Sequence, residues 1–151
     1  MNANLNELEP IILEKLASDG IVSFSSHGTS MMPMLRDGKD SIDLIKKPDK
    51  IRKYDVIFYK RDDGHFVLHR VVKVCKDSTF ILRGDNQYIK EKGVRYDNVI
   101  AILKSFTRKG KKYDVNQFKY KLYSHFWVNT VYIRKLLHYI KSLFRKIFSK
   151  K

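Results

Sequence analysis

The stretch Phe66-Val-Leu-His-Arg-Val-Val-Lys-Val74 decides the fold of this chain. It is rich in β-branched and aromatic residues, which favour an extended strand. Successive side chains of a strand point to opposite faces of a sheet, so His69 and Arg70 face opposite ways. The two faces consist of Val67, His69 and Val71 on one side and Leu68, Arg70 and Val72 on the other.

Short strands are also predicted on both sides of this stretch. Residues 54–59 precede it and are joined to it by a tight turn at Asp63-Gly64, which is the pattern of a β-hairpin. The other strand candidates are residues 21–24, 41–45, 79–82 and 99–106. Because these strands follow one another without alternating helices, the sequence predicts a mostly β chain with a small antiparallel β body.

Apolar residues recur at helical spacing only near the two ends of the chain. Asn6 to Ser18 predicts a short N-terminal helix that ends near Gly20. The apolar positions of a predicted C-terminal helix are Val131, Ile133, Leu136, Leu137, Ile140, Leu143, Phe144 and Ile147. We therefore divide the chain into an N-terminal helix (residues 1–20), a β body (residues 21–107) and a basic amphipathic tail (residues 108–151).

The positive charge of the chain is concentrated in this tail. The formal net charge is +15, of which residues 1–107 contribute +3 and residues 108–151 contribute +12, with Asp114 the single acid of the tail. A basic tail suits an anionic membrane surface or a nucleic acid. The polar positions of its helix are filled by Arg134, Lys135, Lys141, Arg145 and Lys146. We expect this helix to lie in a membrane interface, and packing on the β body or on a partner is the alternative.

Three features bound the location and the redox chemistry. No stretch approaches the about 20 apolar residues that are needed to cross a bilayer. Residues 1–20 lack a basic region followed by an apolar run, so they do not predict a secretory signal. Cys75 is the one cysteine, which excludes an intrachain disulfide, and no tight Cys or His cluster predicts zinc.

A candidate nucleophile lies in the segment Gly28-Thr-Ser-Met-Met-Pro33. A serine in an irregular loop beside a glycine can expose its hydroxyl and place backbone N–H groups next to it. An acyl-transfer enzyme needs both, because it requires a free nucleophile and donors for the oxyanion. Ser30 is therefore the candidate nucleophile, although most loop serines only bond to the backbone.

His69 is the natural general base for such a serine. With an ordinary pKa near ~6.5, an imidazole is largely neutral at pH 7 and can accept a proton. His27 and His65 are competing candidates, and His27 is the closer of the two to Ser30 in sequence. Asp85 follows a predicted strand and is the candidate third member that orients His69, or else a turn residue that caps its own backbone.

Three segments in this order resemble the signal peptidase I-like serine peptidases and the related self-cleaving repressor peptidases. Ser30-Met-Met-Pro33 is similar to the nucleophile box of that family, His69-Arg-Val-Val72 to the base box, and Gly84-Asp-Asn86 to the Gly-Asp-Asn box. The resemblance covers about residues 22–104. The base box has His where common bacterial signal peptidases have Lys, so the chain resembles the Ser-His type.

The resemblance implies a mostly β catalytic fold that binds an extended peptide along a strand edge. Ser30 would form the acyl-enzyme, His69 would be the base and Asp85 the third residue of the triad. The backbone N–H of Ser30 would hold the oxyanion, and we place the substrate contacts beside it at Gly28 and Met31. This chemistry needs no cofactor and no metal.

Two departures from the family pattern leave questions open. A second acid often follows the Gly-Asp-Asn box, and here Glu91 is the sole acid between Gln87 and Gly93. Signal peptidases normally have a membrane span before the nucleophile, and this chain has an acidic amphipathic segment there instead. We therefore expect peripheral or monotopic membrane association through the C-terminal helix, with an active site that faces the cytoplasm.

The leading prediction is a serine endopeptidase that removes a signal or leader peptide, either from exported precursors or from one dedicated precursor. The first alternative is a catalytically inert peptide-binding or accessory module of the same fold. The second alternative, which is less favoured, is a nucleic-acid-binding protein that uses its basic tail. The about 20 residues before the β body are too few for the separate DNA-binding domain of the repressor relatives.

Overall fold

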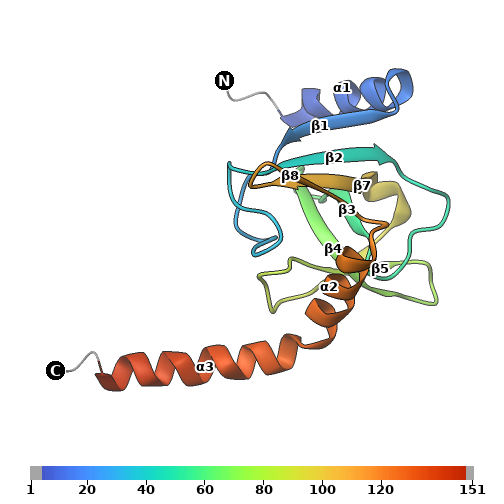
Figure 1. Ribbon diagram of the computed structural model, residues 1–151. Helices are drawn as coiled ribbons and strands as arrows, with labels where there is room; N and C mark the ends of the chain where they lie inside the picture. Colours follow the sequence, from blue (N-terminus) through green and yellow to red (C-terminus); the bar gives the residue numbers. More distant parts are fainter. Residues whose placement is uncertain (1–4, 149–151) are drawn as a thin grey trace.

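An antiparallel sheet forms the body of the protein in a computed structural model that describes residues 5–148 (Figure 1). The strands are β1 (Ile21–Ser25), β2 (Ser41–Lys46), β3 (Val56–Lys60), β4 (Phe66–Val74), β5 (Phe80–Arg83), β6 (Glu91–Val94), β7 (Val99–Arg108) and β8 (Lys111–Asp114). Their order across the sheet is β1-β2-β7-β3-β4-β5-β6, and β8 pairs with β7. The helices are α1 (Leu5–Ser18), the 3₁₀ turn η1 (Tyr96–Asn98), α2 (Phe118–Asn129) and α3 (Val131–Phe148). The predicted mostly β, antiparallel architecture is confirmed.

The strand β4 has the bounds that the sequence predicts and lies between β3 and β5. The β3–β4 hairpin closes through a turn in which the Gly64 N–H donates to the Arg61 carbonyl, and Gly64 takes φ 85°, where a side chain would be strained. In this hairpin His69 is opposite Ile57. The predicted alternation is also confirmed, because Leu68 packs on one apolar cluster and Val71 belongs to another.

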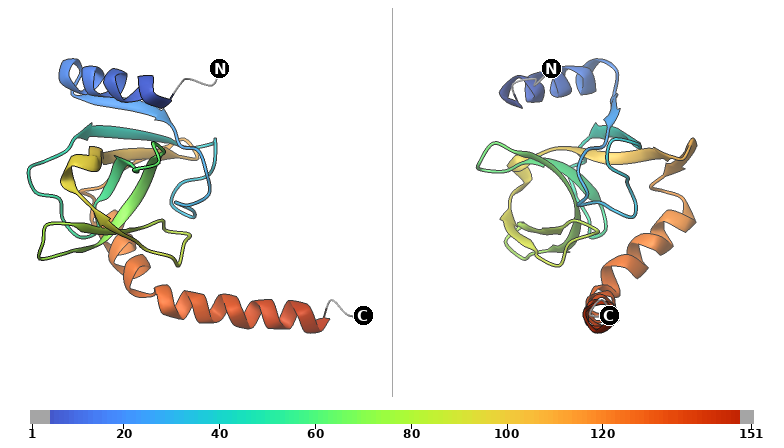
Figure 2. Two further views of the ribbon diagram at one scale, coloured as in Figure 1. Left: turned by 180° about the vertical axis from the view of Figure 1, so that it is seen from behind. Right: turned by 90° about the vertical axis from the view of Figure 1, so that its left-hand side faces the viewer.

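Those two clusters lie on opposite faces of the curled sheet. The first contains α1 and buries residues such as Leu35, Ile42, Leu44 and Leu103. The second is smaller and contains Ile57, Tyr59, Val71, Leu82 and Val99. The right-hand view of Figure 2 shows the green and yellow strands β3–β6 curving round, while α1 covers the far end of the sheet beside β1.

The C-terminal segment begins as part of the body and ends away from it. β8 continues the sheet through a hairpin with β7, and α2 buries Tyr120, Ser124 and Val128 against the body. The β body therefore extends past residue 107, which corrects the predicted start of the tail. After Thr130 the chain changes direction, and α3 runs outward as a separate rod (Figure 1). Among the described helices, none is long and apolar enough to span a bilayer.

The sequence missed β6 and β8, because both are four-residue strands rich in charged residues, and β6 also contains a glycine. The predicted helix positions Leu143, Arg145, Lys146 and Ile147 have side chains outside the described part of the structure, and the same is true of Leu8 in α1.

Candidate active site

Ser30 lies in the loop between β1 and β2, and a second loop holds it in place. The Asn86 N–H donates to the Ser30 carbonyl at 2.8 Å, and the Asn86 side chain donates to the Thr29 carbonyl at 3.2 Å. The approach is close, since a Cβ at Gly84 would come within 2.6 Å of the Ser30 carbonyl oxygen. Glycine is required at this position because any side chain would displace the serine loop. Two of the three predicted segments are thus in direct contact.

The backbone around Ser30 supplies possible oxyanion donors. The N–H groups of Ser30 and Met31 donate no hydrogen bond within the described residues, and Met31 as a whole is only 3% exposed. The predicted contact at Gly28 differs, because its N–H already donates to the Asp37 carboxylate at 2.8 Å. Met31 contributes only its backbone, since its side chain is buried in the core.

His69 is almost completely buried, with 1% of its surface exposed. Its Nδ1 lies 3.1 Å from a carboxylate oxygen of Glu91 and 3.3 Å from the Tyr59 hydroxyl. The Tyr59 hydroxyl donates its proton to Glu91 at 2.6 Å, so both neighbours of Nδ1 can accept. This arrangement places the proton of a neutral imidazole on Nδ1 and leaves Nε2 as the acceptor. Within the described residues Nε2 makes no hydrogen bond, and none joins His69 to the Ser30 hydroxyl.

The surroundings of His69 keep it neutral. Burial lowers the pKa of His69, and the negative charge of Glu91 opposes that shift only in part. Burial alone would raise the pKa of Glu91, but hydrogen bonds from Arg61 and Tyr59 outweigh it and lower that pKa. At neutral pH the pair is therefore a carboxylate beside an uncharged imidazole, which is the state that a general base requires.

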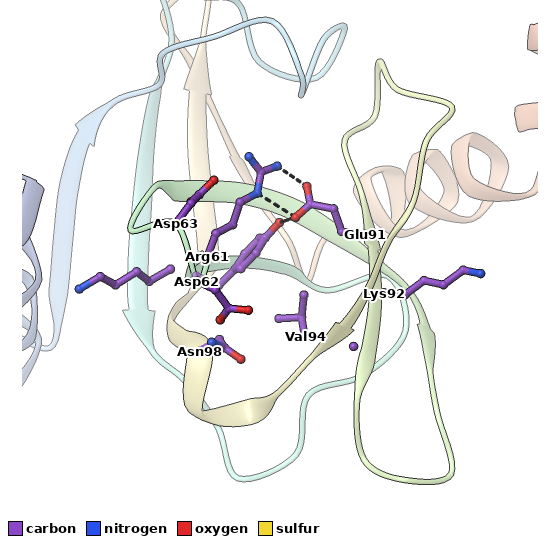
Figure 3. Close-up of a pocket in the computed structure, with 10 residues that line it drawn as sticks. Arg61, Asp62, Asp63, Glu91, Lys92, Val94 and Asn98 are labelled. Carbon is purple, nitrogen blue, oxygen red and sulfur yellow. Dashed lines mark hydrogen bonds and ion pairs between the residues drawn. The ribbon is translucent and has the colours of Figure 1, made fainter.

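Arg61 fixes the position of Glu91. Its Nε donates to Glu91 at 2.9 Å, and its Nη2 donates to the other carboxylate oxygen, so the contact is bidentate. Figure 3 shows the two side chains pointing at each other across the mouth of a pocket, with Asp63 and Asn98 further round the rim. Tyr59 also lines this pocket, whereas Ser30 and His69 do not.

Asp85 does not occupy the position that the sequence predicts. Both of its carboxylate oxygens accept from Arg70, Oδ1 from Nε at 2.8 Å and Oδ2 from Nη2 at 2.7 Å. Tyr123 adds a third hydrogen bond at 3.1 Å. The physical reason is strand alternation, because Asp85 lies on the Arg70 side of β4 and His69 faces the other way. The carboxylate that contacts His69 is Glu91, whose role the sequence left open.

The Arg70–Asp85 pair is the centre of a buried network that includes α2. The Arg70 Nη1 donates to the Tyr54 carbonyl at 3.1 Å, to the Tyr120 hydroxyl at 3.0 Å and to the Ser124 hydroxyl at 2.9 Å. The Asp85 carbonyl also accepts from the Trp127 indole at 2.7 Å and from Arg134 at 3.3 Å. The loop that holds Ser30 is therefore held in turn by the C-terminal helices.

The competing histidines lie outside this arrangement. His27 is exposed and lies 4.0 Å from Asp37, and His65 is exposed and lies 3.1 Å from Asp63. No group of three or more His, Cys, Asp or Glu side chains suited to a metal ion occurs among residues 5–148.

Comparison with known proteins adds no assignment. No family model matches the chain, and neither a curated protein nor a solved structure matches it significantly. The chemistry must therefore be judged from the geometry of the site itself.

Proposed function

We propose that the protein is a serine endopeptidase of the signal-peptidase type that removes a signal or leader peptide from a precursor. Ser30 is the nucleophile, His69 is the general base, and Glu91 orients His69 in place of the expected aspartate. The observation that carries this proposal is the buried His69, whose Nδ1 is held by Glu91 and Tyr59 while Nε2 stays available. A histidine with only a structural role has no need of an oriented carboxylate and an unused acceptor.

The proposed reaction proceeds in two steps. Nε2 of His69 takes the proton of the Ser30 hydroxyl as Oγ attacks the carbonyl carbon of the scissile peptide bond. The C–N bond then breaks, His69 gives its proton to the leaving amine, and an acyl ester remains on Ser30. In the second step His69 removes a proton from water, which attacks the ester and releases Ser30. The N–H groups of Ser30 and Met31 donate to the oxyanion.

Electrostatics support the role of Glu91. His69 carries a positive charge only during the reaction, and the Glu91 carboxylate stabilises that charge at a contact of 3.1 Å. Arg61 and Tyr59 keep Glu91 ionised by their hydrogen bonds. Ser30 and His69 are not hydrogen-bonded without substrate, and such contacts commonly tighten only when substrate binds.

A strand edge beside the site suits an extended substrate. β6 is the last strand in the sheet order, and it contains Glu91. An end strand offers unpaired backbone N–H and C=O groups to an added strand of peptide. This placement brings an extended peptide close to His69.

The test is a comparison of protein N-termini in cells that express the wild type or Ser30→Ala at equal level. New termini are expected only with the wild type, either in many exported proteins or in one precursor. The same termini from both forms, with purified Ser30→Ala still active, would refute the proposal.

One observation favours a second candidate, a catalytically inert peptide-binding module. The Ser30 hydroxyl makes no hydrogen bond to His69. This candidate predicts that the purified wild type binds precursor peptides but releases no product over prolonged incubation, and that Ser30→Ala binds equally well.

A further inference from the structure

The outer surface of α3 is strongly apolar. Ile133, Leu136 and Leu137 each have about 60% of their surface exposed, at 60%, 58% and 60%, and Ile140 has 38%. Their spacing of three and four residues places them along one face of the helix. The tyrosines Tyr132 and Tyr139 are exposed at one margin of this face. We call these six side chains the α3 apolar face.

The opposite side of α3 meets the body or carries positive charge. Arg134 lies 3.8 Å above the Trp127 ring and donates to the Trp127 and Asp85 carbonyls. His138 lies near the ring of Tyr88, with the ring centroids 6.4 Å apart. These contacts fix how the helix is rotated, so the α3 apolar face points away from the β body except at Tyr132, which lines a pocket with Val72 and Arg83.

The remaining polar positions make the partner specific. Lys135 and Lys141 are exposed, and the sequence from residue 115 to residue 151 contains no Asp or Glu. A helix that packs on an ordinary protein surface commonly carries both signs of charge on its polar side. An apolar face with tyrosines at its margin, and a polar side that carries cations and no acid, complements a bilayer with anionic headgroups.

We propose that α3 docks in the plane of an anionic bilayer surface, with the α3 apolar face among the acyl chains. The helix lies in the interface and does not cross it, consistent with its hydropathy. Because Arg134 and Trp127 tie α3 to the Asp85 loop, the docked helix places the candidate active site next to the membrane. The docking does not depend on peptidase activity.

The experiment measures co-sedimentation of the full chain with vesicles of phosphatidylcholine and phosphatidylglycerol, and with vesicles of phosphatidylcholine alone. Two variants form a matched pair. Leu137→Glu adds an acid on the α3 apolar face, and Ser142→Glu adds the same charge on the opposite side of the helix. Only Leu137→Glu also removes an apolar side chain that the proposed docking would bury among the acyl chains. Its partition coefficient on anionic vesicles is therefore expected to be at least about tenfold lower than that of Ser142→Glu.

Several results would overturn the docking proposal. If both variants lost vesicle binding equally, and moderate salt released the wild type from the vesicles, the basic protein would be adsorbed without insertion of the helix. The wild type could instead fail to bind anionic vesicles and form a dimer that Leu137→Glu disrupts. That result would show that the α3 apolar face binds a second copy of the chain. Binding to duplex DNA that displaces the vesicles, with both variants alike, would favour a nucleic acid. Circular dichroism of each variant confirms that the fold is intact, and Ser30→Ala should bind vesicles like the wild type.

Discussion

The neighbouring residues His69 and Arg70 each contact a carboxylate, on opposite sides of β4. On one side His69 contacts Glu91 at 3.1 Å, and on the other Arg70 contacts Asp85 at 2.7 Å. Both side chains are almost fully buried, with 1% and 0% of their surface exposed. His69 and Arg70 share a strand and a depth, but the Glu91 side chain is 27% exposed and the Asp85 side chain only 2%. The two basic groups also differ in how completely their nitrogen atoms are hydrogen-bonded.

Arg70 uses its guanidinium fully, because Nε, Nη1 and Nη2 all donate to partners in the body or in α2. His69 uses only Nδ1, and burial lowers its pKa so that Nε2 can accept a proton. A saturated buried ion cannot take part in a reaction without breaking the fold, whereas a half-satisfied imidazole can. Under the proposed function, the Arg70 side therefore supports the stability of the fold and the His69 side supports the chemistry.

The largest expected effect is on the Arg70 side. Arg70→Met leaves the buried Asp85 carboxylate without its cation, so the free energy of unfolding should fall by about 3–5 kcal/mol. Urea denaturation followed by circular dichroism measures it. Lys60→Met is the control, because the Lys60–Glu9 pair is about one-third exposed and should contribute about 1 kcal/mol or less. An unchanged denaturation midpoint for Arg70→Met would show that the Arg70–Asp85 pair does not stabilise the fold.

The second expected effect is on the chemistry of the other side. His69→Gln keeps a buried polar side chain but cannot act as a base, so cleavage of a precursor peptide should fall by about 10²–10⁴-fold. Its free energy of unfolding should change far less than that of Arg70→Met. Peptide cleavage followed by mass spectrometry, normalised to folded protein, measures the rate. Full activity in His69→Gln would assign His69 to structure as well.

Glu91→Gln sharpens the comparison through pH. The Glu91 charge raises the pKa of His69, so its removal lowers that pKa further. The rising limb of cleavage rate against pH should therefore move to lower pH, while the maximal rate falls by about tenfold or more because the imidazolium loses its partner. Glu9→Gln removes a carboxylate that contacts Lys60 and not His69, and should leave the limb in place. A limb that moves to higher pH, or moves equally in Glu9→Gln, would contradict this role.

The smallest effect is expected where the Asn86 loop contacts the Ser30 loop. Asn86→Ala removes the exposed hydrogen bond to the Thr29 carbonyl but keeps the backbone bond to Ser30. The free energy of unfolding should fall by about 1 kcal/mol or less. The rate of peptide cleavage should fall severalfold, because Ser30 is held less firmly. Gly84→Ala should reduce that rate more, since its Cβ would clash with the Ser30 carbonyl.

The sequence predicted the architecture better than the site. Alternation and turn residues predicted β4, the β3–β4 hairpin and the opposite faces of His69 and Arg70, because these depend on local periodicity. The partner of His69 depends on which strand ends beside it, and Glu91 lies on β6, whose residues Glu91-Lys-Gly-Val94 give no strand signal. Asp85 had the expected position after a strand, but its side of the sheet was visible only in three dimensions. Periodicity also could not predict that the loop containing Asp85 contacts the Ser30 loop through Asn86.

The hydrogen bonds from Trp127 and Arg134 to the Asp85 carbonyl have a consequence for shortened forms of the protein. A chain trimmed after residue 107 would lose β8 and α2, and Arg70 would lose Tyr120 and Ser124. Such a fragment would open a buried ion pair to water and would not be a free-standing folded unit. A chain trimmed after Thr130 would keep α2 and the Trp127 hydrogen bond, and of these two hydrogen bonds would lose only that from Arg134. The bend at Thr130 is therefore the natural place to separate α3 from the body that holds the candidate active site.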